Sequence, residues 1–171
     1  MFAYDSVTAE VVECPQDIVF VVDESGSIAI SDYEMMKSFL SHLVSRLAVN
    51  HGKTRVGFVS YNTHINHFFD LNAHSSVQSL QTAIDKLRAP RGDTNTHLAL
   101  QYVRTILFKS AAGDRSSVPN VIVILTDGIS TDMQGTQVSV NYHLHTHIQW
   151  MNMMFLLTLY GQFPLGELVR N

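Results

Sequence analysis

Three oxygen-bearing side chains alternate along one short segment of the chain. Asp23, Ser25 and Ser27 are each separated by one residue. Because alternate residues of an extended backbone point to the same side, the three oxygens can converge on one point. An Asp-Ser-Ser set is wrong for zinc, which prefers His and Cys, and suits Mg²⁺, which takes hard oxygen ligands and keeps some waters. The segment therefore predicts a magnesium-type site.

Two apolar runs position this segment and a second aspartate. The run 17–22 ends at Asp23, and the run 121–125 is followed by Thr126 and Asp127. Continuous runs rich in β-branched residues are typical of strands buried on both faces of a parallel sheet. Ligands of open α/β sheets bind at the carboxyl ends of the strands. We therefore expect Asp23 and Asp127 to lie at one site.

The remaining apolar patterns alternate between strands and helices. Apolar residues at helical spacing between Met36 and Leu47 predict the first helix, and Ser31 followed by Glu34 is a capping-box signal for its start. The alternation predicts an α/β fold: a doubly wound (Rossmann-like), mainly parallel sheet flanked by helices, with a short antiparallel edge strand. The other expected elements are strands at 54–61 and 64–71, the latter at the edge, and helices at 77–87 and 96–108.

The last forty or so residues follow a less regular pattern. Segment 134–149 has the length of a helix but poor apolar spacing, 153–160 predicts a final strand, and 165–170 resembles the start of a closing helix. We therefore expect this part of the domain to diverge from a regular α/β repeat.

Composition excludes several classes of function. The chain has 171 residues, enough for one domain, and 46% of them are hydrophobic. The net charge is −4, from 11 basic and 15 acidic residues, and no basic run occurs, which disfavours nucleic acid and polybasic membrane binding. The apolar stretch 148–163 is too short for a membrane span, and the first residues lack a signal-peptide pattern.

Three motifs together resemble a known family. Asp23-Glu24-Ser25-Gly26-Ser27 resembles the DxSxS signature of von Willebrand factor type A domains, which carry a metal-ion-dependent adhesion site. Segment 92–96 (Gly-Asp-Thr-Asn-Thr) is similar to the GxTNT loop of that family, and 126–128 (Thr-Asp-Gly) to its TDG motif. The motifs occur in the expected order, and the resemblance covers about residues 14–132, roughly two thirds of the chain.

The resemblance implies a ligand set and a function. Ser25 and Ser27 would bind Mg²⁺ (or Mn²⁺) directly, Thr94 would do so in the liganded state, and Asp23 and Asp127 would bind directly or through water. It implies a non-catalytic adhesion domain in which a Glu or Asp of a partner protein completes the metal shell. The loops resemble those of matrilin-like and collagen-associated members, which implies an extracellular matrix setting with a partner such as collagen.

Two alternatives remain beside this interpretation. One is an intracellular assembly module of the same fold. The other is a Mg²⁺-dependent phosphohydrolase with Asp23 as nucleophile, which is disfavoured because Ser25 stands where such a site needs a second acid. A nucleotide-binding Rossmann enzyme is excluded because no GxGxxG follows the first strand.

The expected domain organisation follows from the same resemblance. Residues 1–13 form an N-terminal extension, and 14–171 form the von Willebrand factor A-like domain, divergent and truncated from about residue 133. The lone Cys14 is either a buried thiol of a reduced protein or one half of a bridge. The resemblance implies the bridge, because extracellular members often place one half of a bridge here, and its partner would lie beyond residue 171. Glu24 and Asp93 are expected to face solvent.

Overall fold

The computed structural model describes residues 14–88, 92–126, 130–144 and 155–156. Among these residues, no helix is both long and apolar enough to cross a membrane. The N-terminal extension, Asp127, the cysteine's proposed bridge and the closing helix expected at 165–170 lie outside the described residues, so these expectations remain predictions.

A five-stranded sheet forms the centre of the domain. Its order is β3-β2-β1-β4-β5; β1 is parallel to β2 and β4, β5 is parallel to β4, and β3 is the antiparallel edge strand. This arrangement confirms the predicted mainly parallel, doubly wound sheet. The strands are β1 (Gln16–Asp23), β2 (Thr54–Tyr61), β3 (Ile65–Phe69), β4 (Asn120–Thr126) and β5 (Phe155–Leu156).

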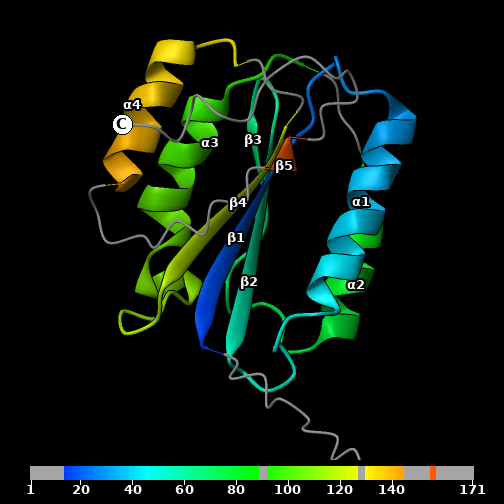
Figure 1. The fold of residues 1–171 in the computed structure, drawn as a ribbon, viewed down its shortest axis with the longest axis vertical. Helices are drawn as coiled ribbons and strands as arrows, with labels where there is room; N and C mark the ends of the chain where they lie inside the picture. The colour runs from blue at the N-terminus through cyan, green and yellow to red at the C-terminus, as the bar shows by residue number, and fades with distance from the viewer. Residues whose placement is uncertain (1–13, 89–91, 127–129, 145–154, 157–171) are drawn as a thin grey trace, which may run out of the picture.

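Helices cover both faces of the sheet. α1 (Ile30–Val44) and α2 (Val77–Asp85) lie on one side, and α3 (Thr96–Tyr102) and α4 (Met133–Leu144) on the other (Figure 1). The carboxyl ends of β1 and β4 reach the edge of the sheet where α1 and α4 begin, the upper edge in Figure 1. The loops that carry the predicted metal ligands therefore gather at one edge of the sheet.

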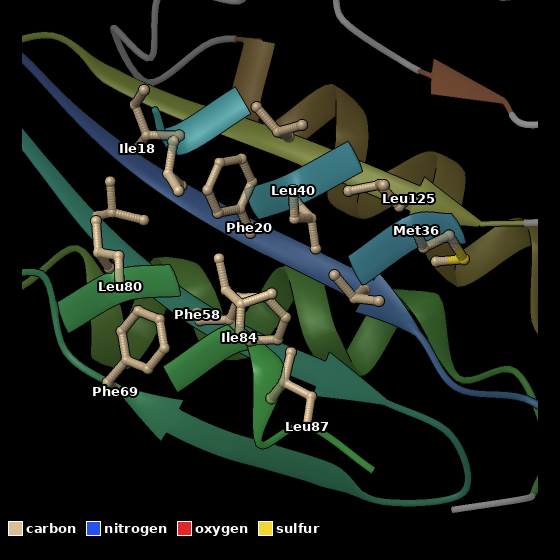
Figure 2. Packing of buried hydrophobic residues seen from close by; sticks show 14 of the residues in the cluster. Ile18, Phe20, Met36, Leu40, Phe58, Phe69, Leu80, Ile84, Leu87 and Leu125 are labelled. Carbon is tan, nitrogen blue, oxygen red and sulfur yellow. The ribbon is translucent and has the colours of Figure 1, made fainter. Parts of the chain in front are cut away.

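Alternation along β1 divides the core into two clusters. Phe20 packs with residues of α1 and α2, among them Leu40 and Ile84 (Figure 2), whereas Val19 and Val21 face α3. All five residues are fully buried. Because both faces of β1 are covered, its run of apolar residues is continuous rather than alternating.

Two helix boundaries differ from those expected. α1 begins at Ile30 with Ala29 at its N-cap, and no side chain caps it, so the capping box predicted at Ser31 is wrong. Glu34 instead pairs with Lys37 on the exposed side of the helix. The helix expected at 96–108 ends as a regular helix after Tyr102 and continues as a π-helical segment, Val103–Leu107.

Two elements near the C-terminus agree with the weaker patterns. α4 falls mostly within the segment 134–149, which has the length of a helix but poor apolar spacing, and β5 lies within 153–160, the expected final strand. β5 pairs with β4 only at Leu125 and Thr126. The divergence and truncation predicted from about residue 133 remain predictions.

An ion pair fastens the opposite end of the sheet. Asp17, which is fully buried, accepts hydrogen bonds from the backbone N, Nε and Nη2 of Arg115 at 2.8, 2.9 and 2.6 Å. The same guanidinium donates to the carbonyls of Gln16, Gly52 and Lys53. One side chain thus ties together the start of β1, the turn before β2 and the loop before β4.

Candidate metal centre

The site begins with Asp23, the last residue of β1. Its buried carboxylate accepts the backbone N–H of Ser25 through Oδ1 at 2.8 Å and the hydroxyl of Thr126 through Oδ2 at 2.8 Å. Thr126 is the last residue of β4. The carboxylate is therefore held between the ends of two adjacent parallel strands.

Two predicted hydroxyl ligands meet beside this carboxylate. The Oγ atoms of Ser25 and Ser27 lie 2.9 Å apart, with Ser25 buried and Ser27 exposed. A hydroxyl oxygen has two lone pairs, so both side chains keep acceptor capacity for a cation after bonding to each other. The structure thus brings Asp23, Ser25 and Ser27 together in one loop.

Thr94 reaches the same region from a second loop. The backbone N–H of Gly26 donates to the carbonyl of Gly92 at 2.9 Å, which joins the two loops. The backbone of Thr94 is held by Thr131: Thr94 N–H donates to the Thr131 hydroxyl at 3.1 Å, and Thr94 C=O accepts the Thr131 N–H at 2.9 Å. Thr94 therefore lies between the serine loop and the segment that leads into α4.

The other side of the threonine loop is fixed to the turn after β2. Thr63 accepts the Asp93 N–H through its hydroxyl at 3.0 Å and the side-chain amide of Asn95 through its carbonyl at 3.1 Å. A Cβ built on Gly92 would lie 2.6 Å from the Thr63 hydroxyl and 3.0 Å from its backbone N. Only glycine allows this close approach of the loop to the turn.

Gly92→Ala is expected to displace the threonine loop. The added methyl group meets backbone atoms that cannot move freely, so we expect a loss of about 1–3 kcal/mol in the free energy of unfolding. Melting in EDTA measures the effect. Gly26→Ala is the matched control, because its Cβ would meet Gly92 only at van der Waals distances of 3.7 and 4.0 Å. Equal melting of the two variants would contradict the close approach.

The chemistry of these donors fits a hard divalent cation. The described part of the site offers one carboxylate and three hydroxyls, from Asp23, Ser25, Ser27 and Thr94. Within the described ranges, no group of three or more His, Cys, Asp or Glu side chains could hold a metal. Oxygen donors of this kind are those that Mg²⁺ and Mn²⁺ prefer. Asp127, the fifth predicted ligand, follows Thr126 directly but lies outside the described residues.

The expectation for Glu24 was wrong. Glu24 was expected to face solvent, but it is 1% exposed and accepts the Tyr33 hydroxyl at 2.5 Å and the side-chain amide of Asn66 at 3.4 Å. Burial raises the pKa of the Glu24 carboxyl, and these two hydrogen bonds partly offset the rise. The alternation of side chains along an extended backbone could have predicted the burial of Glu24. If Asp23 and Ser25 point to the metal site, Glu24 points inward. Asp93 is exposed, as expected.

Fold and site together define an α/β domain with an oxygen-ligand cluster at the carboxyl ends of its parallel strands. The family model of the von Willebrand factor type A domain matches residues 17–148. The chain therefore belongs to the von Willebrand factor type A family. This confirms the resemblance seen in the three sequence motifs.

The relatives are much longer than this chain. It is 37% identical over 130 residues to von Willebrand factor A domain-containing protein 1 of Danio rerio, covering 74% of this chain and 26% of that protein. It is 38% identical over 121 residues to Matrilin-1 of Homo sapiens, covering 69% of this chain and 24% of that protein. The chain thus spans about a quarter of the length of these relatives.

A solved structure confirms the fold. Proximal thread matrix protein 1 from the mussel byssus, with a zinc-occupied MIDAS (metal-ion-dependent adhesion site) motif, superposes with a TM-score of 0.75 at 22% identity. The match covers 81% of this chain and 37% of that chain. At this identity the likeness establishes the fold alone.

Proposed function

We propose that this domain binds a partner protein through a divalent cation. Asp23, Ser25, Ser27, Thr94 and Asp127 hold the cation, and a Glu or Asp of the partner completes its coordination. The observation that carries the proposal is the convergence of Asp23, Ser25 and Ser27 beside the threonine loop.

The donor set explains why such a cation would seek a partner carboxylate. Hydroxyl ligands are neutral, so at most the two carboxylates of Asp23 and Asp127 offset the charge of the ion, and only one does so directly where the other binds through water. The cation keeps a net attraction for anionic oxygen, and a site built on two loops leaves one side open to a second protein. This is binding chemistry and involves no bond cleavage.

Mg²⁺ is the ion that we propose, with Mn²⁺ as its close substitute. Hydroxyl and carboxylate oxygens support this choice, because zinc sites in proteins mostly use His and Cys. The zinc-occupied motif of the mussel protein supports a cation at this position and makes Zn²⁺ the competing ion in any titration.

The relatives support an extracellular setting. They include Matrilin-1 and the collagen alpha-6(VI) chain, and we propose a matrix protein such as collagen as the partner of this domain. An intracellular assembly module with the same site is the alternative. Hydrolysis is disfavoured because Ser25 stands where such a site needs a second acid.

Partner binding should depend on both the cation and Thr94. We expect Thr94→Ala to weaken binding to immobilised collagen by at least about tenfold, the effect of losing one charge-assisted contact. The fold should remain intact, because the contacts of Thr94 with 130–131 run through its backbone. Surface binding with Mg²⁺ and with EDTA measures this effect. Thr82→Ala, an exposed threonine on α2, is the matched control.

Two results would reject this mechanism. One is binding that resists EDTA and is unchanged in Thr94→Ala. The other is metal-dependent turnover of a generic phosphatase substrate that is lost in Asp23→Asn, which would favour the hydrolase alternative.

A further inference from the structure

A buried glutamate between two proposed ligands requires an explanation. Glu24 is 1% exposed, and burial of a carboxyl group is costly even when it is hydrogen-bonded. An apolar side chain of similar volume would fill the same space at lower cost. Its partners show what the carboxyl group provides.

Tyr33 is the principal partner. Its hydroxyl donates to Glu24 Oε1 at 2.5 Å and lies 3.3 Å from the carbonyl of Arg88, near the start of the segment that leads to the threonine loop. Tyr33 itself is buried in the first turn of α1, and its ring belongs to the core cluster beneath that helix. The hydroxyl therefore connects α1 to the serine loop and to the segment that follows α2.

The backbone of Glu24 is fixed as well. Its N–H donates to the carbonyl of Tyr61 at the end of β2 at 2.8 Å, and Asn66 of β3 approaches the second carboxyl oxygen at 3.4 Å. With the backbone and side chain of Glu24 both anchored inward, its neighbours Asp23 and Ser25 are directed to the opposite side.

We propose that Glu24 and Tyr33 form a buried brace that positions the metal-binding loop without contacting the metal. The proposal rests on the proposed function, since it assigns how the ligands of that same site are held. The hydrogen bond of the brace joins two residues nine positions apart in the sequence, one directly after β1 and one in the first turn of α1. It thereby orders the serine hydroxyls before a cation arrives, and preorganisation of this kind increases affinity.

Titration with MnCl₂ alone tests the brace. Tyr33→Phe removes only the hydroxyl and changes no charge, so we expect the Kd for Mn²⁺ to rise about fivefold to tenfold, as for loss of one ordinary intramolecular hydrogen bond. Tyr102→Phe is the matched control: its hydroxyl bonds His67 at 2.9 Å on the other face of the sheet, and its Kd should stay within about twofold of wild type. Calorimetry is performed below the melting range of every variant.

A second variant separates positioning from stability. Glu24→Gln keeps an oxygen that can accept the Tyr33 hydroxyl. Adding Tyr33→Phe to Glu24→Gln should therefore again raise the Kd for Mn²⁺. In the Glu24→Leu background the hydroxyl has no acceptor on residue 24, and Tyr33→Phe should change the Kd less than twofold. A purely structural hydroxyl would lower melting in EDTA and leave the Kd unchanged.

The outcomes distinguish the two proposals. If wild type and Tyr102→Phe bind Mn²⁺ and Tyr33→Phe binds equally well, the brace is overturned and the metal site stands. If wild type binds no Mn²⁺, the proposed function fails, and the role of the brace fails with it.

Discussion

Asp23→Ala is expected to abolish the stabilisation of this domain by divalent cations. A ligand at one hundred times its Kd stabilises the folded state by about 2.7 kcal/mol, which corresponds to about 5–10 °C in the Tm of a domain of this size. Asp23 supplies the one carboxylate in the described part of the site. This carboxylate also holds Ser25 by accepting the backbone N–H of Ser25. Thermal melting with Mg²⁺, with Mn²⁺ and with EDTA measures the gain for each variant.

For each variant, the Tm with cation is compared with the Tm of the same variant in EDTA. This comparison is needed because Asp23→Ala also removes two hydrogen bonds that stabilise the metal-free fold. Asp85→Ala removes the same charge from an exposed position on α2 and should keep the full gain. An equal gain in wild type and Asp23→Ala would contradict the assignment of Asp23 as a ligand.

Asp17→Ala is expected to cause the largest loss of stability, about 3 kcal/mol. Removal of one partner of a buried ion pair leaves the other charge uncompensated, which costs about 3–5 kcal/mol; the lower end applies because the Arg115 side chain is 21% exposed. Three hydrogen bonds from Arg115 to Asp17 are lost as well. Urea unfolding in EDTA measures the change in the free energy of unfolding.

Glu34→Ala provides the comparison for Asp17→Ala. Glu34 pairs with Lys37 at 3.2 Å on the surface of α1 with 61% of its side chain exposed, and such pairs contribute about 0–1 kcal/mol. Asp17 lies at the opposite end of β1 from the metal site, so Asp17→Ala should retain Mn²⁺ binding while it remains folded. A loss no greater than that of Glu34→Ala would show that the ion pair does not fasten the sheet.

The strands could be predicted from sequence because burial on both faces leaves a continuous apolar run. The expected strand 54–61 matches β2 residue for residue, and the runs 17–22 and 121–125 extend by one residue at each end in the structure. Helix ends were less predictable. α1 starts at Ile30 without a side-chain cap, because Ala29 has no side-chain acceptor and Ser31 lies inside the helix.

The proximity of the ligands was predictable, whereas their support was not. Alternation in the segment 23–27 predicted that the oxygens of Asp23, Ser25 and Ser27 converge, and the structure brings these three side chains together. The contacts of Thr94 with Thr131 and of Glu24 with Tyr33 join residues 37 and 9 positions apart. Such contacts depend on how loops and helices pack in three dimensions, and a single sequence carries no periodic signal for them.

Anomalous diffraction from crystals of this domain soaked in MnCl₂ tests the central claim most directly. We expect one strong manganese peak at the carboxyl ends of β1 and β4, about 2.0–2.3 Å from the Oγ atoms of Ser25 and Ser27. Asp127 should lie in the first or the water-mediated shell of the same ion. A peak elsewhere on the domain, or no peak in crystals grown and soaked at saturating Mn²⁺, would contradict the account.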